Sequence, residues 1–321
     1  MNLNRKSYED LSKKLSAELL KYPALFDTRV IIDGIITNYY FTSTEGTQFI
    51  EPVSYVSLTV NGKIRNNKGQ IIRDKRVVIS SDFDKLPSEN ELIKLVNEFA
   101  SDMVSIQSAV EMEEYYFGPV LFENEASATI FASNLISPSG IFSFRKPVQV
   151  MASVARVENT SSKRDVKPLE ERMGKKVLDS RITVVNKTDM KTFDNTPIIG
   201  SYNIDAQGVV PIKEITLIEN GILKNLLSTR VPTIKVGHST GSLRFGARPR
   251  SVILEVSPGV LEISAPMGNT LSQLKEELIK AAMEEGLEYA YIVRKISGDT
   301  DQYIYRVSVK DGSESLVTGA E

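Results

Sequence analysis

In this 321-residue chain, apolar residues first recur with a period of two residues and soon afterwards with a period of about 3.6 residues. This combination constrains the fold class more than any other feature of the sequence. Residues 54–60 alternate strictly, which is the pattern of a strand with one buried face. Further on, an apolar stripe at helical spacing follows Ser88 and Glu91, a capping-box pair. A helix is therefore predicted over 89–108 beside β-structure, which indicates an α+β fold.

Other patterns extend this interpretation along the chain. Apolar spacing predicts a helix over 7–21, and short strand-like runs between turn residues predict antiparallel strands from 28 to 80. Asn61-Gly62 and Asn66–Gly69 are the turn candidates within that stretch. The remaining predicted elements are a strand at 115–122, a helix at 126–135, irregular chain over 136–170 with its most mobile part at 155–170, strands at 182–185, 215–218, 222–227 and 252–256, a helix from 270 to 286, and strands at 289–296 and 303–309.

These elements predict two domains. The first is a mixed α+β domain over residues 1–112, and the second, over 113–321, is dominated by antiparallel strands with a few packed helices. After the turn at Asp311-Gly312 only about nine residues remain. The strand at 303–309 is therefore expected to be an unpaired edge, open to another chain, and the C-terminus is expected to be cut short.

The chain contains one histidine and no cysteine, and these counts limit its chemistry. Alone it cannot supply the nitrogen and sulfur ligands of a typical zinc enzyme. His238 lies in a loop of small residues, where it is either a loop histidine without catalytic duty or part of a substrate cleft. A carboxylate-only cation site is possible, although no calcium-loop motif is present. The absence of cysteine and of a long apolar run leads us to expect a cytoplasmic protein.

The charges are nearly balanced, with 39 Lys and Arg against 41 Asp and Glu, a net charge of −2. This balance offers no footprint for an acidic membrane and disfavours direct nucleic-acid binding. Arg244, Arg248 and Arg250 could form a solvated turn or could grip a carboxylate or phosphate. Glu123 and Glu125 could act as acid and base, although carboxylates also favour a helix N-terminus on structural grounds alone.

Several segments, taken together and in their order along the chain, carry a resemblance to a known family. They are Ser43–Thr47, Tyr116–Glu123, Ala126–Ala128, Gly200–Val209, Leu217–Lys224, Ser239–Gly241 with Arg244, and Glu284–Glu288. Together they resemble the TldD/PmbA family, whose members are described as modulators of DNA gyrase or as peptide-maturation metalloproteases. The resemblance spans about residue 40 to the end. It implies an α+β architecture and dimers, homomeric or heteromeric, that enclose a chamber.

The resemblance also implies a zinc site from which this chain departs. Active members carry His-Glu-x-x-x-His on the helix after the Gly-Pro-Val-Leu strand, where the histidines hold zinc and the glutamate activates water. Here Glu123 and Ala128 stand at the histidine positions, and Asn124 stands at the glutamate position. The chain thus resembles the PmbA-like branch without zinc, so no cofactor is expected here and zinc is expected only in a homologous partner.

The leading hypothesis is therefore a non-catalytic subunit that binds a peptide or unfolded protein during processing. It would form a homodimer, or a heterodimer with a zinc-bearing TldD-like homologue, and Glu125, His238 and Arg244 are the candidate residues of its substrate cleft. Two alternatives remain open. One is a regulator associated with DNA gyrase, and the other is a protease that uses carboxylates such as Glu123 and Glu125 in place of a histidine-bound zinc.

Overall fold

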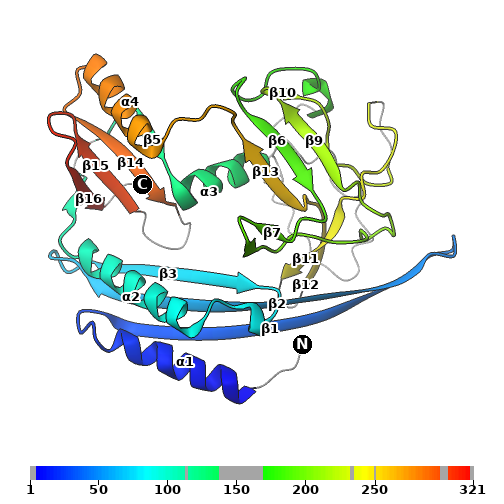
Figure 1. The fold of residues 1–321 in the computed structure, drawn as a ribbon, viewed down its shortest axis with the longest axis horizontal. Helices are drawn as coiled ribbons and strands as arrows, with labels where there is room; N and C mark the ends of the chain where they lie inside the picture. The colour runs from blue at the N-terminus through cyan, green and yellow to red at the C-terminus, as the bar shows by residue number, and fades with distance from the viewer. Residues whose placement is uncertain are drawn as a thin grey trace. The chain divides into compact units, whose positions relative to one another are not determined.

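The computed structural model describes residues 5–112, 115–136, 169–231, 235–248, 251–296 and 303–318. The chain forms two compact units, each assembled from segments that lie far apart in the sequence (Figure 1). The first unit contains Met1–Ile36, Ser54–Ile130 and Asn269–Glu321, and the second contains Thr37–Val53 and Phe131–Gly268. The described elements confirm the α+β class. The predicted domain division at residues 112 and 113 stays a prediction.

A three-stranded sheet confirms the β-structure predicted between residues 28 and 80. Its strands, in spatial order, are β1 (Phe26–Thr42), β2 (Gln48–Arg65) and β3 (Ile71–Ser80). The turn predicted at Asn66–Gly69 joins β2 to β3, where the Asn66 N–H donates to the Gln70 carbonyl at 3.0 Å. Gly69 has a φ of 82°, a conformation that glycine adopts without steric cost.

The turn predicted at Asn61-Gly62 is wrong, because both residues lie inside β2 and pair with Lys75 and Asp74 of β3. The alternation of buried residues continues through this point to Ile64, which is fully buried. A ten-residue register between β2 and β3 therefore outweighs the local turn preference of Asn-Gly. Phe99, in the helix predicted over 89–108, lies against Gly62, since a Cβ added at Gly62 would lie 3.6 Å from the Phe99 ring.

Two helices, α1 (Arg5–Leu19) and α2 (Glu89–Ile106), pack on one face of this sheet and confirm the two predicted N-terminal helices. A short 3₁₀ turn, η1 (Phe83–Lys85), precedes α2. The capping box of α2 is present, with the Ser88 side chain accepting from the Glu91 N–H and Glu91 accepting from the Ser88 N–H. The buried core of this layer is Leu15, Leu19, Leu25, Leu58, Val60, Ile64, Ile72, Leu92, Val96, Phe99, Ala100, Met103, Ile106 and Tyr303.

The first unit also contains a five-stranded sheet. Its spatial order is β4 (Val110–Glu111), β16 (Glu314–Thr318), β15 (Tyr303–Ser308), β14 (Tyr289–Lys295) and β5 (Val120–Phe122). The predicted C-terminal helix is α4 (Leu271–Glu284), which begins at the capping box of Thr270 and Gln273. Its buried Leu278 and Ala282 pack against β14 and β15.

The structure corrects two predictions about this sheet. The strand expected at 303–309 is not an edge, because the chain turns back after Asp311-Gly312 and β16 pairs antiparallel with β15. The backbone groups of β15 are thus used on both sides, and the argument that this strand recruits another chain fails. The strand expected at 115–122 is confined to Val120–Phe122, which pairs parallel with β14.

A four-stranded sheet forms the centre of the second unit, in the order β10 (Ile222–Leu223), β9 (Glu214–Glu219), β6 (Thr183–Lys187) and β13 (Val260–Ser264). The predicted Asn220-Gly221 turn connects β9 to β10 and is confirmed, with φ values of 50° and 75°. Positive φ at both central residues is the requirement of the tightest hairpin turns. The strand predicted over 222–227 ends at Leu223.

The remaining described elements are the hairpins β7 (Thr192–Phe193) with β8 (Thr196–Pro197) and β11 (Leu243–Arg248) with β12 (Ser251–Val256), the helix α3 (Asn124–Leu135) and the 3₁₀ turn η2 (Leu169–Arg172). The segment 155–168, where we expected most of the mobile part, lies outside the described residues. Within the described ranges, no helix is both long and apolar enough to cross a membrane.

Candidate functional site

The start of α3 holds the three positions that correspond to the expected metal motif. Glu123 follows β5 directly, and its N–H donates to the Val293 carbonyl of β14 at 3.0 Å. Asn124 then takes a φ of 50°, which turns the chain from the strand into the helix. This geometry buries the Glu123 side chain beside β14, while Ala128 is exposed one turn further along the helix.

An ion network holds the carboxylate of Glu123. The Arg294 guanidinium donates to Glu123 from one nitrogen and to Glu314 from another, the latter at 2.8 Å. Glu314 also accepts from Lys275 at 2.6 Å. Two carboxylates and two cations therefore balance one another on the surface of the five-stranded sheet.

The pKa shifts of Arg294 and Glu314 favour the charged forms of these two groups. Burial alone would lower the pKa of Arg294, but its contacts with Glu123 and Glu314 outweigh burial and raise that pKa. Burial would raise the pKa of Glu314, yet Lys275 and Arg294 hold it below its ordinary value. The guanidinium also lies over the Tyr305 ring, 4.2 Å from its centroid. Arg294 and Glu314 were not predicted as site residues, although an arginine within an apolar strand is itself a sign of a buried partner.

The second unit contains the other two predicted residues, His238 and Arg244, on the chain that leads into β11. The His238 side chain is exposed, and its backbone carbonyl accepts from the Ser228 hydroxyl at 2.9 Å. Ser228 and Thr240 are buried, and each hydroxyl accepts from the backbone N–H of the other residue, at 3.0 Å for the Ser228 hydroxyl and 2.7 Å for the Thr240 hydroxyl. This segment is therefore fixed by hydroxyl groups, and His238 takes no part in a catalytic arrangement with a neighbouring nucleophile among the described contacts.

Arg244 is half-buried, and its guanidinium carbon lies over the ring of Tyr202, 4.3 Å from the ring centroid. Its Nη1 donates to the Pro258 carbonyl at 2.8 Å. No ion pair involves Arg244 within the part of the chain that the structure describes. Burial lowers the pKa of Arg244, and the nearby charges of Tyr202 and Glu51 only partly oppose that effect. The side chains of Arg248 and Arg250, which could form a solvated turn or an anion-binding cluster with Arg244, lie outside the described residues.

Tyr202 lies beneath the Arg244 guanidinium, and Asp205 accepts from the N–H of the preceding Leu243 at 3.3 Å; we had not predicted either of them as a site residue. The Tyr202 hydroxyl donates to the Gly241 carbonyl at 2.8 Å, and the ring is buried. Asp205 accepts from the N–H groups of Gln207 and Val209 at 2.8 and 2.9 Å, and thereby closes the turn that follows it. Burial raises the pKa of Asp205, and these backbone hydrogen bonds only partly oppose it. The Asp-x-x-Gly pattern at 205–208 could have indicated the turn.

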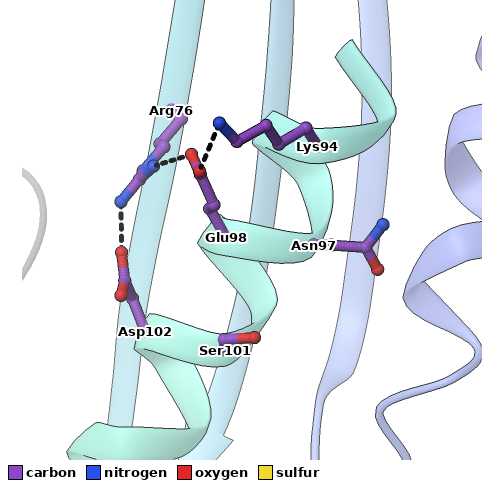
Figure 2. A pocket seen from close by; sticks show the side chains of 6 residues that line it. All are labelled: Arg76, Lys94, Asn97, Glu98, Ser101 and Asp102. Atoms are coloured by element: carbon purple, nitrogen blue, oxygen red, sulfur yellow. Dashed lines mark hydrogen bonds and ion pairs between the residues drawn. The ribbon is translucent and has the colours of Figure 1, made fainter. Parts of the chain in front are cut away.

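A hollow of about 580 Å³ lies beside α2 in the first unit (Figure 2). Its lining residues are Arg76, Lys94, Asn97, Glu98, Ser101 and Asp102. Arg76 pairs with Asp102, and the Glu98 carboxylate lies 3.9 Å from Arg76 and 3.8 Å from Lys94. Because these charges neutralise one another, the hollow offers no preference for an anion or a cation.

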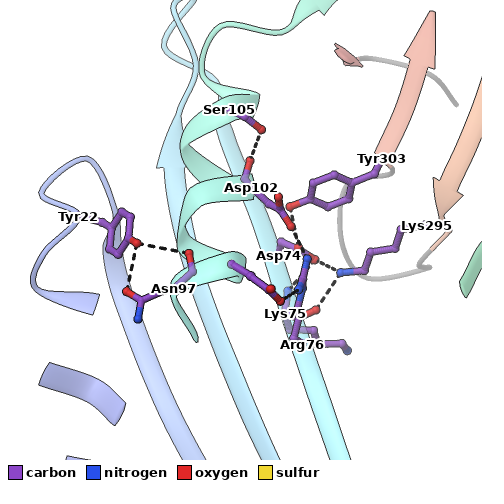
Figure 3. Close-up of polar contacts among 10 residues, drawn as sticks. Tyr22, Asp74, Lys75, Arg76, Asn97, Asp102, Ser105, Lys295 and Tyr303 are labelled. Carbon is purple, nitrogen blue, oxygen red and sulfur yellow. Dashed lines mark hydrogen bonds and ion pairs between the residues drawn. The ribbon is translucent and has the colours of Figure 1, made fainter. Parts of the chain in front are cut away.

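Behind this hollow, a buried polar cluster connects β3 with β14 and β15 (Figure 3). Asp74 is fully buried and accepts from Lys295 and, at 2.9 Å, from the Tyr303 hydroxyl. Burial is the main cause that raises the pKa of Tyr303, and the charge of Asp74 adds to it. Each group has its partner, so this cluster fastens the two sheets of the first unit together.

Comparisons with known proteins assign the chain to a family. A family model described as the PmbA/TldA metallopeptidase C-terminal domain matches residues 116–312, more than half of the chain. The chain belongs to the TldD/PmbA family. No curated protein matches it.

Solved structures share the fold of this TldD/PmbA member. One is a proposed modulator of a DNA gyrase from Thermotoga maritima, with 15% identity, a TM-score of 0.63, and coverage of 98% of this chain and 64% of that one. A second, a proposed modulator of DNA gyrase from Bacteroides thetaiotaomicron, has 12% identity, a TM-score of 0.62 and coverage of 98% and 62%. TldE from Thermococcus kodakarensis has 15% identity, a TM-score of 0.60 and coverage of 96% and 63%. The chain thus spans less than two thirds of each of these proteins.

The residues at the motif positions do not suit the zinc that the resemblance led us to expect in active members of the family. Ala128 has no donor atom, and the carboxylate of Glu123 is already held by Arg294. Glu125 is exposed on α3, and among the described residues no three His, Cys, Asp or Glu side chains gather in a way that could hold a metal. A zinc ion at this point would have to displace Arg294 and would find one oxygen ligand where the family pattern supplies two histidines.

Proposed function

We propose that this chain is a non-catalytic member of the TldD/PmbA family that serves as a structural and substrate-binding subunit in peptide or protein processing. The observation that carries the proposal is the pairing of Glu123 with Arg294 at the position where the motif would place a metal ligand. A guanidinium at this position repels a metal cation and holds the carboxylate that could otherwise bind it.

The same pairing argues against a carboxylate protease. Catalysis by two carboxylates requires one of them to accept a proton and both to face one cleft. The Glu123 carboxylate accepts from the Arg294 guanidinium, and Glu125 is exposed on the first turn of α3. The two carboxylates therefore lie in different surroundings, one paired with an arginine and one exposed to solvent. This arrangement does not provide an acid and a base that face one substrate.

Regulation of DNA gyrase is an alternative function because two of the similar structures are named as proposed gyrase modulators. Their likeness to this chain, at 15% and 12% identity, concerns the fold alone. The net charge of −2 disfavours direct DNA contact, which depends on an excess of Lys and Arg. A role of this kind would therefore act through a protein partner.

The partner that we propose is a homologue that retains His-Glu-x-x-x-His, or a second copy of the chain. A mixing experiment tests the function: the purified chain, a zinc-bearing homologue, and both together are incubated with an unfolded protein such as reduced casein. We expect no cleavage by the chain alone and faster or altered cleavage by the mixture, with co-elution on gel filtration. Cleavage by the chain alone that survives EDTA would instead support the carboxylate protease, and no effect on the homologue would contradict the subunit role.

A further inference from the structure

Arg244 is an unusual cation because its charge is partly desolvated and, among the described residues, forms no ion pair. Its exposed fraction is intermediate, and its pKa is lowered by burial. A buried charge is ordinarily paired, since removing it from water without a partner is unfavourable. Within the described residues its polar contact is the single hydrogen bond to the Pro258 carbonyl. The guanidinium carries five N–H donors in one plane, so most of its donors remain for another molecule.

The surroundings of Arg244 hold that plane in place. The Tyr202 ring lies beneath the guanidinium and is itself fixed by the hydrogen bond of its hydroxyl to Gly241. Gly241 has a φ of 69° and touches the backbone of Pro211, where an added Cβ would lie 2.6 Å from the Pro211 Cα. The donors of Arg244 are therefore oriented before any ligand arrives, which lowers the entropy cost of binding.

The local charge selects the class of ligand. Arg244 is one positive charge, and Glu51 is close enough to favour its charged form although the two make no ion pair. A doubly charged phosphate would be left with excess negative charge beside Glu51. A carboxylate carries a single charge and two oxygens that match the guanidinium fork in a bidentate pair. Carboxylate is therefore the better match of the two anions.

We infer that Arg244, stacked on Tyr202, is a carboxylate-binding residue that anchors the peptide substrate. The inference rests on the proposed function, because it names the chemical group by which the bound peptide is held. The carboxylate can come from the C-terminus of the peptide or from an Asp or Glu side chain. Both sources share the same contact with Arg244, and an experiment can separate them.

Three fluorescein-labelled decapeptides with the same neutral sequence serve as probes: one with a free C-terminus, one with a C-terminal amide, and one amide that contains a single glutamate. Binding to the full chain is followed by fluorescence anisotropy at pH 7. We expect the free acid, the glutamate peptide or both to bind at least about tenfold more tightly than the neutral amide. Which of the two gains affinity identifies the source of the carboxylate.

Substitutions test whether Arg244 causes the tighter binding of peptides that carry a carboxylate. Arg244→Met should abolish the preference for a carboxylate, and Arg244→Lys should retain only part of it, because lysine keeps the charge but loses the fork. The control is Arg230→Met, an arginine of the same unit that pairs with Glu45 at 2.7 Å and should leave the preference unchanged. Circular dichroism confirms that each variant is folded.

The outcomes separate the inference from the function on which it rests. If all three peptides bind the wild-type chain equally, the peptide-binding role stands and the carboxylate inference is overturned. The inference also fails if Arg244→Met retains the preference or if both Arg244 variants and Arg230→Met lose it alike. If none of the peptides binds at any concentration tested, the proposed substrate-binding function fails and takes the inference with it.

Discussion

Arg294 in the first unit and Arg244 in the second both lie over a tyrosine ring, 4.2 Å from the centroid of Tyr305 and 4.3 Å from that of Tyr202. Their charge balance differs. Arg294 binds two carboxylates and has a raised pKa, whereas Arg244 has no ion pair among the described contacts and has a lowered pKa. The same stacking contact thus serves two purposes, and the presence of an anionic partner distinguishes a closed structural network from a cation that remains open to a ligand.

Methionine substitutions of Arg294 and Arg244 should differ strongly in their effect on stability. Arg294→Met leaves Glu123 buried without its cation and should lower the free energy of unfolding by about 3 kcal/mol. Arg244→Met loses a cation–π contact and one hydrogen bond but removes a desolvated charge, so its cost should stay below about 1 kcal/mol. Urea unfolding followed by far-ultraviolet circular dichroism measures both, since the chain has no tryptophan. Equal losses in the two variants would show that the networks do not differ as described.

The pH dependence of stability should also differ between the two units, with a smaller effect of about 1 kcal/mol or less. Glu314 has a pKa below its ordinary value of 4.5, so its contribution is present above pH 4.5 and is lost as the pH falls through the folded-state pKa. Asp205 has a pKa above its ordinary value of 3.8, so its contribution is present below pH 3.8 and is lost as the pH rises through the folded-state pKa.

The two conservative amide variants should therefore respond to pH with opposite signs. The cost of Glu314→Gln should be larger at pH 7 than at pH 3, because the charged carboxylate is the stabilising form. The cost of Asp205→Asn should be smaller at pH 7 than at pH 3, because burial disfavours the charged carboxylate at high pH. Urea titrations at both pH values test the signs, and a common sign for the two variants would contradict the opposite pKa shifts of Glu314 and Asp205.

Local patterns predicted much of the fold. The α2 capping box at Ser88 and the Asn220-Gly221 hairpin depend on residues close in sequence, and both are confirmed. Asn61-Gly62 failed because its strand is held by a partner strand and by a helix above it, which no local pattern records. The pairing of β15 with β16 was missed because the short strand after Asp311-Gly312 carries little alternation of its own.

The candidate site also contains contacts between residues far apart in sequence, which local patterns do not predict. The sequence placed Glu123 and Ala128 at the motif positions and offered Arg244 as a candidate, because each of these rests on a residue type at a known position. Arg294 lies 171 positions from Glu123, and its pairing with that carboxylate depends on the parallel register of β5 and β14. Partners that are brought together by tertiary structure could not be read from spacing along the chain.

Zinc content tests most directly whether the start of α3 has exchanged a metal site for an ion network. The purified chain is equilibrated with zinc, dialysed against metal-free buffer and measured by elemental analysis, alongside Glu123→Ala. The balanced network predicts far less than one zinc per chain in the wild type and no change in the variant, because Arg294 holds the carboxylate and Ala128 offers no ligand. One zinc per wild-type chain that is lost in Glu123→Ala would contradict the account.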